Sequence, residues 1–285
     1  SNAKSASRAA RPARSRTVAQ WAAFAGLLLV VVLLLLALAR SSQSVISDDD
    51  PVRFTEPSPR DPRPTDPAIP RFERSDPRAE LSSGLLLANV VLTQGAFGAV
   101  VVVGALVFAI PLWAFGVPET ALARGLPGLA LGVGFGVALW LANEGAGAVA
   151  DATGAGYDET VRELLAPDTP TGWALLLGVA LPTVAVVEEV VFRGAAIGVV
   201  AAGFSLSPWL LAVVSAVVFG AAHGAQGRVG MAVTGGLGLV LAAGFVLTES
   251  LLVVVVAHYL VNALELVVHE GLGYERLTVE TLTGG

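Results

Sequence analysis

The stretch Ala185-Val-Val-Glu-Glu-Val-Val-Phe-Arg-Gly194 places two adjacent carboxylates and one arginine inside an apolar run from Trp173 to Ala202. About 20 apolar residues are enough for a helix to cross a bilayer. Each charge at the centre of such a helix costs at least about 2.5–3.5 kcal/mol, so three charges in one run indicate a specific role. Residues four apart share a helix face, so we expect Glu189 and Arg193 to pair while Glu188 stays available for chemistry.

The composition is that of an integral membrane protein. The chain has 285 residues, of which 54% are hydrophobic and 14% charged, and its mean hydropathy is +0.73. These values exclude an ordinary soluble globule. Cysteine is absent, which excludes a disulfide framework, a cysteine-ligated metal and a thiol nucleophile. We therefore expect a multi-pass protein of the cell membrane, surrounded by lipid and without a nucleic-acid partner.

The hydrophobic runs predict an all-α, polytopic transmembrane helix bundle with about seven spans, since only helices or closed barrels can cross a bilayer. The region 81–118 is taken as one long helix, and Pro111 predicts a kink or an end within it. The expected spans cover residues 19–39, 81–118, 126–150, 173–202, 208–223, 230–247 and 249–269.

Charge and proline content divide the chain further. Residues 1–18 are basic and free of acids, so the positive-inside rule predicts a cytoplasmic N-terminus, and we regard Ser1–Ala3 as an expression remnant. Residues 40–80 hold eight prolines, seven arginines and nine acids, which predicts a solvated linker. We expect a basic N-terminus (1–18), a first helix (19–39) and a linker (40–80). These are followed by N-terminal membrane helices (81–170), a catalytic helix bundle (171–270) and a tail (271–285).

Polar groups inside the last spans define a candidate site. In lipid such groups face the bundle interior and meet one another. His258 and Asn262 are four apart and share one helix face. His269 lies near a helix end and receives no role. Asn143 and Glu144 lie near the end of their span, and we interpret them as interfacial residues. A short amphipathic segment over 159–165 is expected on the membrane surface. The candidate groups are Glu188, Glu189, Arg193, His223, His258, Asn262 and Glu265.

These residue types fit hydrolysis. Glu188 could act as general base on a water held by His223, and His258 with Asn262 could stabilise an oxyanion. A second arrangement stays open, in which Glu188, His223 and His258 hold a zinc ion, because three ligands and a water are typical of catalytic zinc. Taken singly, each group also has a structural interpretation as an ion pair, a core histidine or an interhelical hydrogen bond. Their concentration in otherwise apolar spans favours a site.

Three motifs carry a resemblance to a known family. Glu188-Glu189-Val-Val-Phe-Arg193, Phe219-Gly-Ala-Ala-His223 and His258-Tyr-Leu-Val-Asn262 occur in order on separate hydrophobic segments. Their pattern resembles the CPBP family of intramembrane proteases, also called the Abi or type II CAAX prenyl endopeptidase family. The resemblance covers roughly residues 173–269.

The resemblance implies an endopeptidase that acts on a membrane-associated protein or peptide. Glu188 would activate water with help from His223, Glu189 and Arg193 would orient the site, and His258 with Asn262 would stabilise the oxyanion. Family members cleave the C-terminal tripeptide of prenylated CAAX proteins or serve in bacteriocin maturation and self-immunity. The family is often labelled metalloprotease; we expect a metal-free site, with zinc as the alternative. The rival functions are a catalytically idle scaffold or immunity-type binding protein and a proton-coupled transporter.

Overall fold

The computed structural model describes residues 2–47, 83–117, 123, 125–152, 162 and 165–274, and these are helical apart from short connections. The expected linker from residue 48 on, the tail from residue 275 on and most of the amphipathic segment 159–165 lie outside the described residues. The main elements are α1 (Asn2–Ser47), α2 (Ser83–Val107), α3 (Gly125–Ala152), a continuous helical segment Pro170–Phe204, α8 (Pro208–Ala222), α9 (Gly227–Thr248) and α10 (Leu251–Leu266).

The all-helical membrane architecture is confirmed. Large apolar side chains point outward from the bundle; Leu92, Leu106 and Val217 are 73%, 74% and 68% exposed. Such a surface is rare on a soluble monomer and normal for one facing lipid. The helix α8 has 15 residues and is about 22 Å long. It is therefore shorter than the hydrocarbon core of a bilayer, which is about 30 Å thick. Within the part of the chain that the structure describes, six helical segments are long and apolar enough to cross a membrane, namely Val18–Ser41, Gly84–Val107, Gly125–Ala148, Pro170–Phe204, Gly227–Thr248 and Leu251–Gly271.

Proline and small polar residues decide where the helices begin and end. The expected long helix over 81–118 instead ends at Val107, and a 3₁₀ turn, η1 (Leu112–Phe115), follows Pro111. Proline has no backbone N–H and cannot continue a helix ladder. Ser207 caps α8, its side chain accepting from the N–H of Leu210, and Pro208 stands in the first turn. Ser250 caps α10 in the same way.

The segment Pro170–Phe204, called the glutamate segment because it contains Glu188 and Glu189, is not a regular α-helix. It consists of α5 (Pro170–Leu175), a π-helical turn η3 (Leu176–Ala180), α6 (Leu181–Glu189), a longer π-helical stretch η4 (Val190–Val199) and α7 (Val200–Phe204). Wider π turns inside helices are frequent at functional sites. Glu188 and Glu189 end α6, while Arg193 belongs to η4, so the change of helix type falls on the charged residues.

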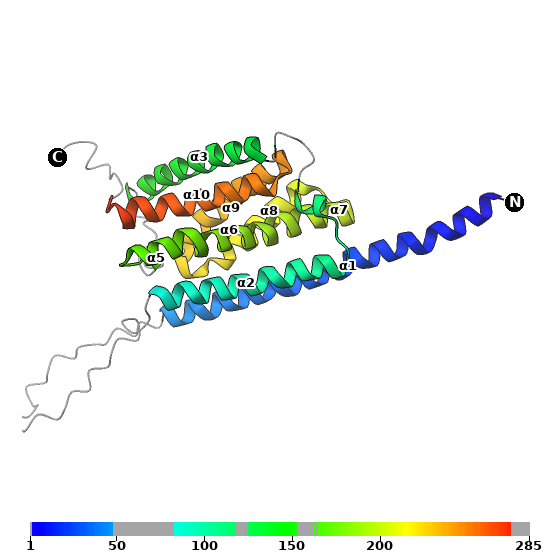
Figure 1. Ribbon diagram of the computed structural model, residues 1–285, viewed down its shortest axis with the longest axis horizontal. Helices are drawn as coiled ribbons and strands as arrows, with labels where there is room; N and C mark the ends of the chain where they lie inside the picture. Colours follow the sequence, from blue (N-terminus) through cyan, green and yellow to red (C-terminus); the bar gives the residue numbers. More distant parts are fainter. Residues whose placement is uncertain are drawn as a thin grey trace, which may run out of the picture.

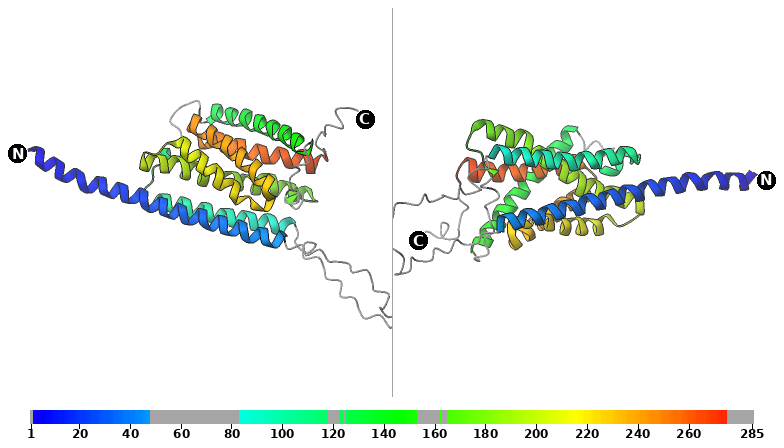
Figure 2. Two further views of the ribbon diagram at one scale, coloured as in Figure 1. Left: turned by 180° about the vertical axis from the view of Figure 1, so that it is seen from behind. Right: turned by 90° about the horizontal axis from the view of Figure 1, so that it is seen from below.

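The bundle has two outer helix pairs with the glutamate segment between them. The helices α1 and α2 lie side by side at one edge, and α3 and α10 lie side by side at the other (Figures 1 and 2). The helices α8 and α9 form a hairpin packed against the centre. Close approach of α3 and α10 depends on Gly136, where an added Cβ would lie 2.9 Å from the backbone of Ala257. This packing brings α2, α6, α8, α9 and α10 around one interior.

Candidate active site

The expected pair of Glu189 and Arg193 is present and fully buried. Arg193 Nη1 lies 2.9 Å from Glu189 Oε1, and the two side chains are 1% and 0% exposed. Arg193 Nη2 donates a second hydrogen bond of 2.9 Å to the backbone oxygen of Gly238 on α9. The guanidinium also stacks over Phe219, with Cζ 4.5 Å from the ring centroid. Arg193 therefore ties the glutamate segment to both helices of the α8–α9 hairpin.

Glu189 also positions His258. The Nδ1 atom of His258 lies 2.7 Å from Glu189 Oε1, the oxygen that Arg193 contacts. A carboxylate accepts hydrogen bonds, so Nδ1 carries the proton and donates. The other ring nitrogen, Nε2, faces Glu188 and lies 3.8 Å from its Oε2 atom. The sequence prediction that Glu189 is the structural carboxylate is consistent with this arrangement.

Glu188 has one engaged and one open oxygen. Its Oε1 accepts a hydrogen bond of 3.1 Å from Gln94 Nε2 on α2. Its Oε2 is buried and has no hydrogen-bond partner among the described residues. The side chain is 12% exposed. A carboxylate with a buried open oxygen is an arrangement that can accept a proton.

The second histidine is oriented by its own helix. His223 Nδ1 lies 2.8 Å from the backbone oxygen of Phe219, one turn earlier in α8. Because a carbonyl only accepts, Nδ1 donates here, and the neutral ring keeps its lone pair on Nε2. The ring of Phe219 packs against both histidines, with centroid distances of 4.6 Å to His223 and 6.1 Å to His258. The phenylalanine of the second motif thus packs between the ion pair and the histidines.

A cavity of about 350 Å³ joins these groups. Glu188, His223, His258 and Asn262 all line it, which brings together the four residues proposed for the chemistry. Much of its wall is apolar and comes from α2, the glutamate segment and α9, including Leu87, Leu176, Val184, Val233 and Leu237. A concave, mostly apolar cavity with a few convergent polar groups is the usual form of a binding site.

Two contributors to the site were missed from the sequence. Gln94 lies on α2, outside the motif region, and its only sequence signal is a polar amide inside an apolar run. Gly238 contributes a backbone oxygen, which no side-chain pattern can reveal. Both contacts cross between helices that are far apart along the chain.

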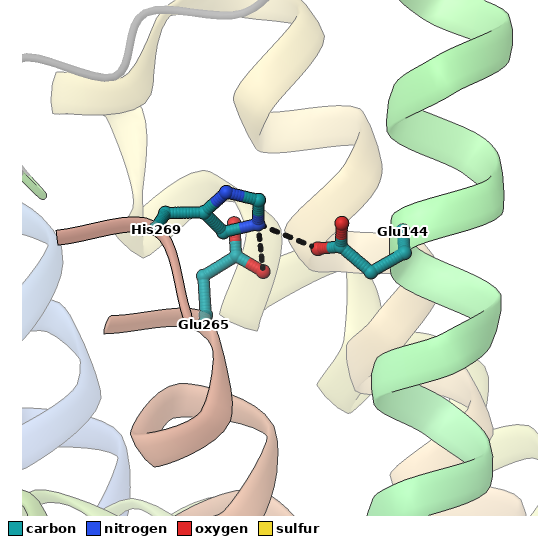
Figure 3. A group of neighbouring side chains, drawn as sticks. All are labelled: Glu144, Glu265 and His269. Atoms are coloured by element: carbon teal, nitrogen blue, oxygen red, sulfur yellow. Dashed lines mark hydrogen bonds and ion pairs between the residues drawn. The ribbon is translucent and has the colours of Figure 1, made fainter. Parts of the chain in front are cut away.

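The metal alternative depends on which carboxylate and histidine side chains bring their ligand atoms close together. Within the described ranges, one group of three residues, Glu144, Glu265 and His269, brings its potential ligand atoms within 4.8 Å of one another (Figure 3). Glu188, His223 and His258 do not form such a group. Glu144, expected to be interfacial, and His269, which had no expected role, therefore belong to a second polar cluster.

Comparison with known proteins supports the motifs. Residues 170–264 match the family model described as type II CAAX prenyl endopeptidase Rce1-like. No curated protein and no solved structure matches the chain. The matched range contains all three motifs and every residue proposed for the chemistry. Residues 170–264 thus form a domain of the Rce1-like type II CAAX prenyl endopeptidase (CPBP) family, a family of proteases.

Proposed function

We propose that this protein is an intramembrane endopeptidase that hydrolyses a peptide bond of a membrane-associated protein or peptide. Glu188 is the general base in this proposal. The observation that carries it is the open, buried Oε2 of Glu188 at the wall of a cavity that His223, His258 and Asn262 also line. A positioned general base contributes roughly 10²–10⁴-fold to rate.

The proposed first step is attack by water. Glu188 Oε2 takes a proton from the water while the water oxygen bonds to the carbonyl carbon of the peptide, and the electron pair of the carbonyl moves to its oxygen. His223, with its lone pair on Nε2, accepts a hydrogen bond from the same water and orients it. Glu188 then returns the proton to the leaving amine as the C–N bond breaks. Gln94 holds the glutamate in place through its other oxygen.

His258 and Asn262 are proposed to stabilise the developing negative charge. They are one turn apart on α10 and line the same cavity. His258 already donates from Nδ1 to Glu189, so donation from Nε2 as well requires a positively charged ring. Glu188 and Glu189 lie on either side of that ring. Removing a single oxyanion donor typically lowers kcat by about 10²–10³-fold.

The substrate class is proposed from the cavity wall. Apolar residues of α2, the glutamate segment and α9 line the cavity, which suits an apolar segment or a lipid-modified end of the substrate. The family match implies a protein substrate. The name of the family refers to cleavage of prenylated proteins near the C-terminus.

The test is cleavage of a library of fluorogenic, membrane-associated peptides by the purified protein in lipid. Glu188→Gln should lower the rate at least about a hundredfold, while the matched control Glu249→Gln, at an exposed position, should retain it. A strong chelator separates the mechanisms: unchanged activity supports a glutamate-activated water, and loss restored by zinc in both the wild type and His269→Gln supports a metal at Glu188, His223 and His258. A well-folded wild type that cleaves nothing would instead favour the scaffold function.

A further inference from the structure

The cluster of Glu144, Glu265 and His269 lies outside the family match and is not used by the proposed hydrolysis. We infer that these three residues form a second site, which binds a divalent transition-metal cation such as Zn²⁺. The site joins α3 to the end of α10 and the π-helical turn η6 (Val267–Gly271) that continues it. Its side chains point toward one another from the two helices, as Figure 3 shows.

The distances suit one ion. His269 Nε2 lies 2.9 Å from Glu144 Oε1 and 3.9 Å from Glu265 Oε2, and the potential ligand atoms all lie within 4.8 Å. Zinc binds nitrogen at about 2.0–2.1 Å and carboxylate oxygen at about 2.0–2.2 Å, so the ligands of one ion lie roughly 3–4 Å apart. Small rotations of two glutamate side chains close the remaining difference.

The orientation of His269 is that of a metal ligand. Its Nδ1 lies 2.7 Å from the backbone oxygen of Tyr274 and therefore donates to it. Metal-binding histidines usually donate their second nitrogen to a carbonyl or carboxylate in this way. With the proton on Nδ1, Nε2 is the nitrogen that can bind a metal, and it faces the two carboxylates. His269 Nε2 and Glu144 Oε1 lie 2.9 Å apart. Two acceptor atoms do not approach so closely without a cation between them, and that cation is either a proton on Nε2 or a metal ion.

Neighbouring groups orient the carboxylates. Arg162 Nη1 contacts Glu265 Oε1 at 3.1 Å, on the oxygen away from His269, and Asn143 Nδ2 donates to Glu265 Oε2 at 3.4 Å. A guanidinium nearby opposes a second cation, but Arg162 Nε also lies 2.6 Å from Glu270 Oε1, and this third carboxylate offsets its charge. Carboxylates on membrane-spanning helices are costly unless a cation compensates them, so a bound divalent ion would stabilise this arrangement.

The site also borders the cavity. Asn143, Arg162 and Glu265 line the same cavity as Glu188. A cation held here would join α3 to α10. It would also fix the cavity wall at Glu265, toward the end of α10 and away from His258. Binding to the native state alone stabilises a protein, so the expected readout is structural and is independent of peptide cleavage.

The test measures zinc bound to the purified full-length protein in detergent, by elemental analysis after equilibrium dialysis. The wild type should bind about one ion per chain at this site. Glu144→Gln and His269→Gln should each weaken binding at least about tenfold, since each removes a ligand. The matched control His223→Gln removes a histidine of the family motif and should keep this ion.

X-ray absorption at the zinc edge of the wild type provides a measurement that needs no variant. The chain has three histidines, and the proposed site uses one of them, whereas zinc at Glu188, His223 and His258 would use two. One imidazole per zinc supports the inference. It is overturned if wild-type protein binds no zinc, if the ion carries two imidazoles, or if zinc survives in His269→Gln but not in His223→Gln. Wild-type protein that binds zinc at this site but cleaves no peptide would overturn the proposed function and leave this site in place.

Discussion

Arg193 forms a fully buried ion pair with Glu189, and the cost of disrupting this pair can be given a magnitude. Replacing Arg193 with methionine keeps an unbranched chain of similar thickness but removes the charge. The change deletes the contact with Glu189 and the hydrogen bond to Gly238, both 2.9 Å long. It also removes the cation from the face of Phe219.

The expected loss is about 3–5 kcal/mol of unfolding free energy, the usual result of leaving one charge of a buried pair alone. Glu189 is 0% exposed, so water cannot compensate it. His258 still donates to the same oxygen, which places the estimate toward the lower end. The stacking on Phe219 is worth about 2 kcal/mol when desolvated, and it does not simply add, because all these contacts share one side chain.

The assay is reversible unfolding of the purified protein in mixed detergent micelles. Arg228→Met is the matched control, since Arg228 is exposed in the first turn of α9, and its unfolding free energy should change by no more than about 0.5 kcal/mol. The double variant Glu189→Gln with Arg193→Met should be more stable than Arg193→Met alone, because residue 189 then carries no uncompensated buried charge. A loss below about 1 kcal/mol for Arg193→Met, or a double variant no better than the single one, would refute the reasoning.

Three further changes test packing and chemistry. Gly136→Ala places a Cβ 2.9 Å from the Ala257 backbone and should destabilise by about 1–3 kcal/mol; Gly134→Ala, with nothing within 4 Å, should not, as thermal unfolding will reveal. Gln94→Leu removes the donor to Glu188 and should slow peptide cleavage about tenfold, equivalent to roughly 1.4 kcal/mol; an unchanged rate would exclude a positioning role. Asn262→Leu should lower kcat about 10²–10³-fold with little change in KM; an effect on KM alone would contradict oxyanion stabilisation.

The features predicted correctly are those that depend on short sequence distances. The pair of Glu189 and Arg193 follows from the four-residue spacing on a helix, and the ion pair is present at 2.9 Å. His258 and Asn262 follow from the same spacing and line one cavity. The helical membrane architecture follows from hydropathy, which is also local. The role of each residue in catalysis and the division of the chain into domains stay predictions.

The features that were missed depend on contacts between helices. Gln94 meets Glu188 across 94 positions of the chain, and Glu144 meets His269 across 125. Hydropathy places each of these helices in the membrane but says nothing about its neighbours or its rotation about its own axis. The contact between α3 and α10 is decided by how closely Gly136 lets two backbones approach, which is a property of packing.

By itself, the sequence determined that the chain crosses the membrane as helices, that the charged groups within its spans gather in the last ones, and that three motifs of a protease family occur there in order. Helix periodicity and the high cost of charge in lipid are sufficient for those conclusions. Only the tertiary structure decided which oxygen of Glu188 stays open, that one oxygen of Glu189 serves both Arg193 and His258, and that Glu144 and Glu265 meet His269. Each of these depends on the relative placement of separate helices, which is set by interhelical packing and is not encoded in any single span.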